Sequence, residues 1–225
     1  MTERVVVIIP AFNAERSIGN VVAGAREQME HVVVVDDGSV DRTGEVAREA
    51  GAHVLRHPAN RGKGAALKTG FAYALENGFD GVITLDADGQ HLPREIPKFL
   101  ECRAQSGADL IIGGRAHLFE QMLPRRRFAN RFSAWTIAKA SKTGVTDSQS
   151  GFRFYSANLL RNVKLRADGF DMESEVIVRA GCRGFKVTTT PIDLGFVDGL
   201  STSHYKPLAD SLRIAWTVVR ARFGA

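Results

Sequence analysis

The stretch "VITLDADGQH", residues 82–91, joins an apolar run to two aspartates, Asp86 and Asp88. The β-branched and apolar residues predict a buried strand. Side chains two positions apart on an extended chain point to the same side, so the two carboxylates would converge. Because no cation stands beside them in sequence, they predict a site for a hard divalent ion such as magnesium.

Gln90 follows two residues later and adds a neutral oxygen that a metal could bind. His91 is interpreted as a loop residue rather than as a ligand. The alternative for the whole cluster is the N-terminal cap of a helix over "LPREIPKFL", with one spare acid. Either interpretation puts the cluster at the carboxyl end of a strand.

The same pattern of a strand followed by a helix recurs through the first half of the chain. Strands alternating with helices predict an α/β fold with a mostly parallel central sheet covered on both faces. The predicted strands cover 4–10, 31–36, 52–56, 81–86 and 108–114, and the predicted helices cover 15–29, 42–50, 63–77 and 94–106.

After residue 115 the sequence becomes more basic and amphipathic. A helix is predicted over 171–181, strands over 185–190 and 192–197, and a final helix over 206–222. No internal repeat or linker separates this part from the first. The chain is therefore predicted to be a single domain, 1–225, with halves 1–115 and 116–225.

Composition and charge limit the partners of the protein. A net charge of +5 suits an anionic partner such as phosphates, a lipid surface or nucleic acid. Nucleic acid is disfavoured because no aromatic platform accompanies the basic residues. Two distant cysteines, Cys102 and Cys182, indicate neither a disulfide framework nor a metal knuckle. With no signal peptide and no apolar stretch of membrane-spanning length, the sequence predicts a cytoplasmic protein.

Polar clusters follow four of the predicted strands: "PAFNAE", "DDGSVDRT", "DADGQH" and "GGR". Turn chemistry alone would explain "DDGS". It does not explain four clusters at one edge of a sheet, which is where ligands of open parallel sheets bind.

Two basic motifs remain open. "NRGKGAALKTG", 60–70, is not a P-loop because Leu67 stands where glycine is required. It is either an anion site at a helix N-terminus, with Arg61 and Lys63, or the plain start of a helix. The run Arg125–Arg127 with Arg131 is either a solvated helix face or a contact for phosphate or a membrane surface.

Taken together, "IIPAFNAE", "VVDDGSVDRT", "NRGKGAALKTG", "LDADGQH", "LIIGGR" and "SQSGFR" resemble the family 2 glycosyltransferases of GT-A fold. The most similar group is the polyprenyl- and dolichyl-phosphate mannose synthases and their glucosyl relatives. The resemblance covers about residues 5–200. It implies an inverting, metal-dependent transfer of a sugar from a GDP- or UDP-sugar, with Mg²⁺ or Mn²⁺, to a polyprenyl phosphate at the cytoplasmic face of a membrane.

The resemblance also assigns roles to individual residues. The half 1–115 binds the nucleotide sugar, through Pro10, Ala11, Asn13, Glu15, Asp37, Lys63, Asp86, Ala87 and Arg115, together with Lys186 and Ser201 from the acceptor-side half 116–225. Asp37 is expected near the base or ribose, Asp86 on the ribose side and Arg115 near the diphosphate. Asp88 and Gln90 are the expected metal ligands.

The predicted catalytic residues are Asp88, Arg115, Arg127 and Arg153, of which Arg127 and Arg153 are assigned to the acceptor phosphate. One position departs from the family. The family often carries the pattern Arg-x-x-Gly-x-Ser, and here Phe196 occupies the arginine position, before Gly199 and Ser201. This difference concerns the identity of the donor or acceptor.

The acceptor decides whether a base is needed. A lipid phosphate, with a second pKa of about 6, is largely a dianion at pH 7 and needs little help. A sugar hydroxyl would need a carboxylate, and Glu173, Glu175 or Asp147 are the candidates. Two rival functions are a haloacid-dehalogenase-type phosphatase, disfavoured by Gln90 after the Asp-x-Asp-Gly sequence, and a non-catalytic sugar-nucleotide-binding scaffold at a membrane.

The predicted final helix has one apolar stripe that includes Leu212 and Trp216, with Arg213 and Arg220 on another face. It is either a closing helix packed on the core or an interfacial helix lying on an anionic membrane. The second alternative predicts peripheral, salt-sensitive membrane association.

Overall fold

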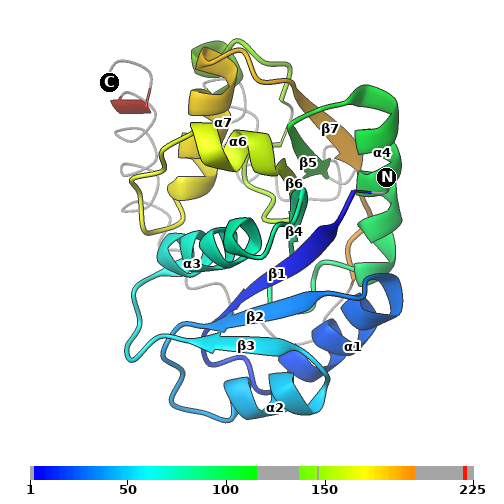
Figure 1. Ribbon diagram of the computed structural model, residues 1–225, viewed down its shortest axis with the longest axis vertical. Helices are drawn as coiled ribbons and strands as arrows, with labels where there is room; N and C mark the ends of the chain where they lie inside the picture. Colours follow the sequence, from blue (N-terminus) through cyan, green and yellow to red (C-terminus); the bar gives the residue numbers. More distant parts are fainter. Residues whose placement is uncertain (1–2, 116–136, 146, 196–219, 222–225) are drawn as a thin grey trace, which may run out of the picture.

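The computed structural model describes residues 3–115, 137–145, 147–195 and 220–221 of the chain (Figure 1). The described residues form a seven-stranded sheet with the order β3-β2-β1-β4-β6-β5-β7. The strands are β1 (Val5–Ala11), β2 (Val32–Asp36), β3 (His53–Arg56), β4 (Gly81–Thr84), β5 (Leu110–Gly114), β6 (Arg153–Ser156) and β7 (Val187–Pro191).

The sheet is parallel except at β6. Strands β3, β2, β1 and β4 run parallel, and so do β5 and β7. Strand β6 lies between β4 and β5 and is antiparallel to both, with Thr84 of β4 opposite Arg153. The start of β6 therefore lies at the carboxyl edge of the parallel strands, beside the ends of β4 and β5.

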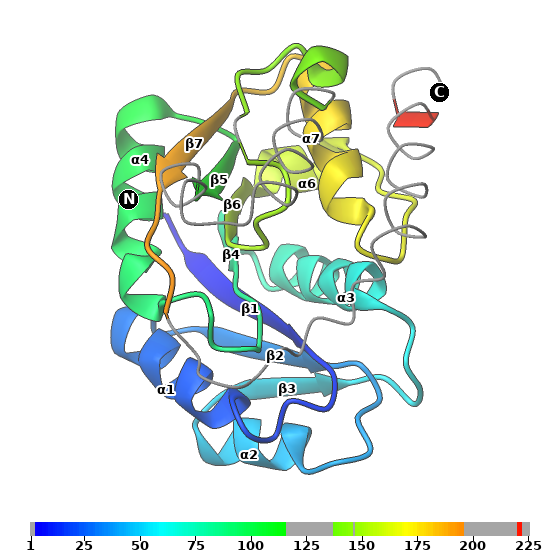
Figure 2. The same ribbon diagram turned by 180° about the vertical axis from the view of Figure 1, so that it is seen from behind.

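Helices cover both faces of the sheet (Figures 1 and 2). Helices α1, α2 and α4 lie on one face, and α3, α6 and α7 on the other. Their bounds are α1 (Ile18–Gln28), α2 (Thr43–Glu49), α3 (Lys63–Glu76), α4 (Ile96–Ser106), α6 (Ala157–Asn162) and α7 (Met172–Cys182), with a 3₁₀ turn, η1 (Pro93–Glu95), before α4.

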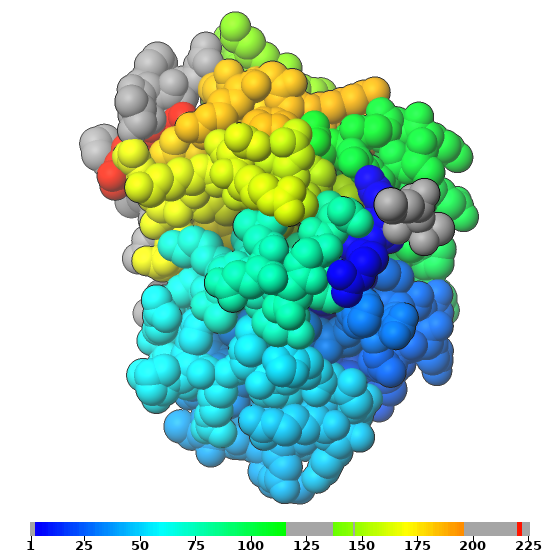
Figure 3. Space-filling view, viewed as in Figure 1, coloured from blue at the N-terminus to red at the C-terminus, as the bar shows by residue number. Residues whose placement is uncertain are grey.

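Alternation along the strands explains the two-sided core. In β1, Val6 and Ile8 face the α3 side, whereas Val7 and Ile9 face the α1 side. All seven residues of β1 are buried, as expected for a central parallel strand. Helix α3 packs against α6, and the two adjoin at the surface in Figure 3, so elements from both halves of the sequence share one core.

The first five predicted strands and the first four predicted helices are confirmed, as are the helix near 171–181 and the strand near 185–190. The predictions missed β6 and α6, because "RFYS" is only four residues long and runs directly into the helix. A strand over 192–197 was wrong for the described residues 192–195, which form only an isolated bridge between His91 and Leu194. Of the predicted helix 206–222, only Arg220 and Ala221 are described, and both are helical.

Among the described residues, no helix combines the length and the apolar character that crossing a membrane requires.

Candidate active site

The carboxyl edge of β4 carries Asp86, whose carboxylate has a cation directly beside it. The Lys63 ammonium, at the start of α3, lies 2.6 Å from Asp86 Oδ1 and 3.2 Å from Glu173 Oε1 of α7. No cation stands beside Asp86 in the sequence, but the fold brings Lys63 to it. Lys63 lies more than twenty residues before Asp86 in the sequence, so the local sequence around Asp86 does not reveal the pair.

This pairing fixes the charge state of Asp86. Burial alone would raise the pKa of Asp86, but the charges around it, Lys63 above all, lower the pKa to about 2. His91 Nδ1 lies 3.5 Å from the other carboxylate oxygen. Burial lowers the pKa of His91, whose ring packs on Phe152, so the imidazole is neutral at pH 7.

Asp88 differs from Asp86 in having no cationic partner among the described residues. Its Oδ1 accepts a hydrogen bond of 2.9 Å from the backbone N–H of Gln90. The Gln90 side chain is exposed. The Asp88 carboxylate is thus partly exposed at the edge of the site and held in place by its own turn.

The charges of this region fit a divalent cation. Asp86, Asp88, Asp147 and Glu173 face the cations Lys63 and Arg115, with the buried Arg153 beside Glu173, so the acids outnumber the cations by one. The described residues contain no group of three His, Cys, Asp or Glu side chains able to hold a metal ion by themselves. A magnesium-type ion needs only one or two protein carboxylates, because it completes its shell with substrate phosphates and water.

Arg115 follows β5 and is oriented by Asp147. Its Nε donates to Asp147 Oδ2 at 2.7 Å and its terminal nitrogen donates to Oδ1 at 3.2 Å. Burial would lower the pKa of Arg115, but the hydrogen bond and charge of Asp147 outweigh it and raise the pKa. The pKa of Asp147 is lowered by the same contacts, against the effect of its burial. Among the described residues, these hydrogen bonds to Asp147 use two of the five N–H groups of the guanidinium.

At the start of α3, where the sequence predicts either an anion site or a plain helix start, three backbone N–H groups bind protein oxygens. The N–H groups of Arg61 and Gly62 donate to the Asp37 carboxylate, and the N–H of Ala65 donates to the Asp168 carbonyl. A Cβ on Gly64 would lie 2.7 Å from the carbonyl carbon of Asp168. The glycine therefore permits close backbone contact, and these backbone donors are already used.

Asp37 is the centre of a buried hydrogen-bond cluster. Besides the two backbone donors, its Oδ1 lies 2.6 Å from His57 Nδ1, and His57 Nε2 lies 2.9 Å from Thr69 Oγ1. The Asp37 residue is 3% exposed. The carboxylate thus joins the end of β2 to the start of α3, and its contact with a base or ribose stays a prediction.

The segment after β1 is held in a similar way. Pro10 and Ala11 end β1 and are buried. The Asn13 side chain accepts the N–H of Val40, and the Glu15 side chain accepts the N–H of Arg42. The two loops that follow β1 and β2 are therefore fastened together at the carboxyl edge, and their contacts with a nucleotide stay predictions.

Two predicted site residues are wrong. Arg153 is fully buried, and its guanidinium donates to the carbonyls of Ser148, Ser150 and Glu173, so it cannot bind an acceptor phosphate. Lys186 precedes β7 at the amino edge of the sheet and donates to the Ser106 carbonyl at 2.7 Å. It therefore lies at the edge opposite the Asp86 site.

Arg127, Phe196 and Ser201 lie outside the described residues, as do Arg125, Arg126 and Arg131. Ala87 is described and buried; its carbonyl accepts the hydroxyl of Ser17 at 2.6 Å. This contact links the Asp86–Asp88 turn to α1.

Comparison with known proteins now identifies the family. The sequence profile described as "Glycosyl transferase family 2" matches residues 6–164. The chain belongs to glycosyl transferase family 2. It is 31% identical to the polyprenol monophosphomannose synthase of Mycolicibacterium smegmatis, over 85% of this chain and 77% of that protein. It is 32% identical to the undecaprenyl-phosphate mannosyltransferase of Micrococcus luteus, over 84% of this chain and 82% of that protein.

The fold is also found in solved structures. The glucosyl-3-phosphoglycerate synthase of Mycobacterium tuberculosis, crystallised with Mg²⁺ and uridine diphosphate, superposes with a TM-score of 0.73. The match covers 98% of this chain and 79% of that chain, at 20% sequence identity. The predicted GT-A fold is thereby confirmed, and the chain is a glycosyltransferase.

Sequence reasoning missed three parts of this glycosyltransferase site: Lys63 as partner of Asp86, Asp147 as partner of Arg115, and the space left by Gly151. A Cβ on Gly151 would lie 2.6 Å from Asp86 Oδ2 and 2.8 Å from Lys63 Nζ. The sequence signal for this space is the glycine of "SQSGFR", a motif that carries the family resemblance.

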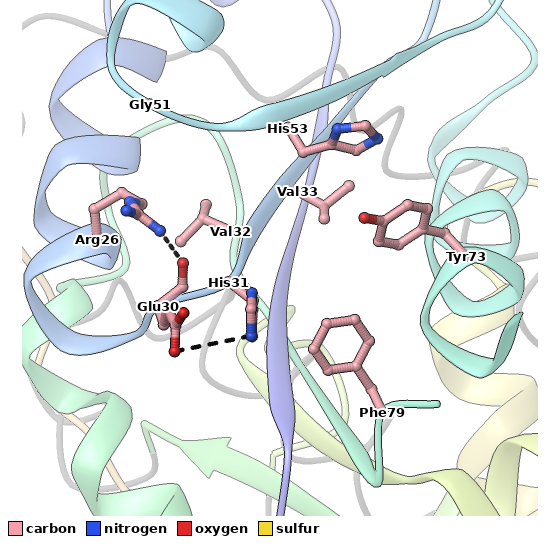
Figure 4. Close-up of a pocket in the computed structure, with 9 residues that line it drawn as sticks. All are labelled: Arg26, Glu30, His31, Val32, Val33, Gly51, His53, Tyr73 and Phe79. Atoms are coloured by element: carbon pink, nitrogen blue, oxygen red, sulfur yellow. Dashed lines mark hydrogen bonds and ion pairs between the residues drawn. The ribbon is translucent and has the colours of Figure 1, made fainter. Parts of the chain in front are cut away.

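A separate pocket of about 140 Å³ lies at the amino edge of the sheet (Figure 4). His53 stacks on Tyr73, and His31 meets Phe79 edge to face, at centroid distances of 5.0 Å in both pairs. The pocket is lined by residues from the start of β2 and β3, so it is distinct from the Asp86 site at the carboxyl edge.

Proposed function

We propose that this glycosyltransferase transfers a sugar, with inversion, from a nucleoside diphosphate sugar to a polyprenyl phosphate. The observation that carries the proposal is the similarity, over more than four fifths of the chain, to two enzymes named for polyprenol and undecaprenyl phosphate acceptors. The charged edge built from Asp86, Asp88 and Arg115 supplies a site for the donor. The base and sugar of the donor are left to the experiment below.

The donor's diphosphate is the leaving group, and this chain offers it two kinds of contact. Asp88 and Gln90 would hold a divalent cation, Mg²⁺ or Mn²⁺. When bound, such an ion supplies Lewis-acid stabilisation of the departing diphosphate. Arg115, held by Asp147, directs its remaining N–H groups to the same negative charge.

In the transfer, the bond between the anomeric carbon and the diphosphate oxygen breaks with its electron pair going to the diphosphate. A phosphate oxygen of the acceptor forms the new bond on the opposite face of the sugar. The acceptor is already largely a dianion at pH 7, so no proton has to be removed by the protein.

The carboxylates support a phosphate rather than a hydroxyl acceptor. Asp147 is bound to Arg115. Glu175 is buried and accepts the N–H groups of Arg166 and Ala167 as well as Arg179 Nε. Glu173 lies beside Lys63 at 3.2 Å. Each of the three candidate bases therefore has a cationic partner, and a hydroxyl acceptor would have to displace one of them.

A polyprenyl phosphate acceptor also places the enzyme at a membrane. We propose peripheral association with its cytoplasmic face through basic side chains, including Arg125–Arg127. Co-sedimentation with liposomes tests this. Binding to vesicles with anionic lipid should fall as salt rises, because exposed charges are screened. Equal binding to neutral and anionic vesicles, or to neither, would contradict it.

The decisive experiment combines the purified protein with GDP- and UDP-sugars, a short polyprenyl phosphate, and Mg²⁺, Mn²⁺ or a chelator. We expect radiolabelled sugar to enter the organic phase with one donor and only with metal, and nuclear magnetic resonance of the product to show an inverted anomeric configuration. Transfer to a soluble hydroxyl acceptor instead, with none to the lipid, would overturn the acceptor assignment. Donor binding without any turnover would support the scaffold alternative.

A further inference from the structure

The cluster of Lys63, Asp86 and Glu173 joins three elements that are far apart in the sequence. Lys63 begins α3, Asp86 follows β4 and Glu173 lies in the first turn of α7. The lysine side chain is 17% exposed, and that of Glu173 is 8% exposed. The ammonium thus lies between two carboxylates and forms an ion pair with each.

The side chains of this cluster fit together because a glycine, Gly151, lies beside them. Gly151 lies against Asp86 and Lys63 so closely that a methyl group there would overlap both carboxylate oxygens and the ammonium. Its carbonyl accepts the hydroxyl of Thr84 at 2.7 Å, which fixes the glycine to the end of β4. The glycine thus leaves room for a charge pair.

A second set of contacts holds α3 and the segment before α7 together without involving Asp86. Ala65 N–H donates to the Asp168 carbonyl, and Lys68 forms an ion pair with the Asp168 carboxylate. The approach of the two segments therefore does not depend on Lys63. The Lys63 contacts add the end of β4, through Asp86, to these segments.

We propose that Lys63 is a positioning residue, which holds the Asp86 carboxylate in the orientation that binds the donor, and that it does not itself bind the diphosphate. This inference rests on the proposed function, which makes Asp86 a donor contact. Glu173 is the second anchor of the ammonium. Through it, α7 of the acceptor-side half fixes a residue of the donor site.

The geometry supports this role over direct phosphate contact. The Lys63–Asp86 distance of 2.6 Å is that of a strong charge-assisted hydrogen bond. The pKa of Lys63 lies above its ordinary value, because the charges of Asp86 and Glu173 outweigh the effect of burial. If the ammonium moved away to a phosphate, Asp86 and Glu173 would lose their shared cation, and an unpaired charge at the buried Glu173 is costly.

A double-mutant cycle separates the two roles. The affinities of UDP and GDP with Mg²⁺ are measured by calorimetry for the wild type, Lys63→Met, Asp86→Asn and the double variant. If Lys63 acts through Asp86, Lys63→Met weakens binding about tenfold in the wild type and less than about twofold in the Asp86→Asn background. If Lys63 binds the diphosphate directly, about the same loss occurs in both backgrounds, which overturns the inference.

Two further variants distinguish positioning from general damage to the fold. Lys68→Met removes the neighbouring ion pair of the same helix and should leave nucleotide affinity unchanged. Gly151→Ala inserts a methyl group between the charges and should reproduce the loss of Lys63→Met. Glu173→Gln keeps an oxygen for the ammonium and should cause a smaller loss. Unfolding midpoints identify any variant that has not folded. Equal losses of affinity in Lys63→Met and Lys68→Met would show a structural role and overturn the inference.

The failure of the inference differs from the failure of the proposed function. If the wild type binds neither UDP nor GDP with Mg²⁺, the proposed donor class is wrong, and the positioning role fails with it. If the wild type binds one of them and the effects of Lys63→Met and Asp86→Asn are additive, only the positioning role fails. If the effects are non-additive and no sugar is transferred, the positioning role stands and the catalytic proposal fails.

Discussion

Two strands of this enzyme, β2 and β4, end in closely spaced aspartates, and the carboxylates of the two pairs differ in their partners. At the end of β2, Asp37 is buried and accepts the N–H groups of Arg61 and Gly62, and its carboxylate also contacts the ring of His57. At the end of β4, Asp86 is bound by a lysine from another element, and Asp88 keeps its charge at the edge of the site.

The difference shows that an acidic motif at a strand end does not define its own role. Asp37 is buried, and its carboxylate accepts several hydrogen bonds that stabilise it in the fold. Asp86 forms a charge pair with Lys63, whereas Asp88, which has no cationic partner among the described residues, keeps its negative charge at the edge of the site. We therefore expect the fold to depend more on Asp37 and the chemistry to depend more on Asp88.

The largest effect predicted from this comparison is on Asp88. Asp88→Asn removes a metal charge at the edge and no core packing, so transfer should fall at least about 100-fold. The unfolding midpoint should change little. Both are measured on the same preparation, with activity assayed across a range of Mn²⁺ concentrations.

Asp80→Asn is a suitable control, because Asp80 is an exposed aspartate that accepts the N–H of Arg4 at the other edge of the sheet. It should retain activity. Undiminished transfer by Asp88→Asn would show that the metal assignment is wrong.

The second prediction concerns stability at the β2 pair. Asp37→Ala leaves two backbone N–H groups and a buried histidine without their acceptor, so the free energy of unfolding should fall by about 3 kcal/mol. Denaturant titration measures it. Asp41→Ala, which removes the acceptor of Thr43 N–H at the start of α2, should cost about 1 kcal/mol.

If Asp37→Ala raised the Michaelis constant for the donor and kept full stability, the structural role of Asp37 would be contradicted. Asp37 would then contact the nucleotide, as the family resemblance implies, and its hydrogen bonds to the α3 start would be dispensable.

The third prediction concerns how the stability contributed by the ion pair of Arg115 and Asp147 depends on pH. The pKa of Asp147 is lower in the folded protein, so the stability it contributes is present above its unfolded pKa and is lost as pH falls through the folded value. Asp147→Asn should therefore be less stable than the wild type at pH 7, and the difference should narrow on acidification. Glu76→Gln, at the exposed end of α3, should give no such narrowing. A difference that stays constant with pH would mean that the pair contributes no charge-dependent stability.

Much of the fold was predictable, because β-branched runs such as "VVVIIP" and "VVVVD" are buried on both faces and mark central parallel strands. Strand β6 was not, since it inserts antiparallel between β4 and β5 and its four residues carry no period of their own. Its position depends on tertiary pairing rather than on local pattern.

The site was predictable where a residue and its role lie in one motif, and not where a partner comes from elsewhere. Asp86 and Asp88 were found from their spacing. The Lys63 and Asp147 partners were not, because 23 and 32 residues separate the paired positions. Arg153 and Lys186 were misassigned because alignment to a family motif does not reveal which way a side chain points.

The smallest effect is expected for a substitution at Lys186. It tests whether the donor contacts only the carboxyl edge of the sheet and not the amino edge. Lys186 is exposed at the amino edge, where its ammonium donates to the Ser106 carbonyl. Lys186→Ala should change stability by less than about 0.5 kcal/mol, as for most surface substitutions, and should leave the donor Michaelis constant unchanged. Arg115→Ala, at the carboxyl edge, should raise that constant markedly in the same assay. If Lys186→Ala raised it as much as Arg115→Ala does, the donor would contact both edges, and the division between framework and chemistry drawn from β2 and β4 would be wrong.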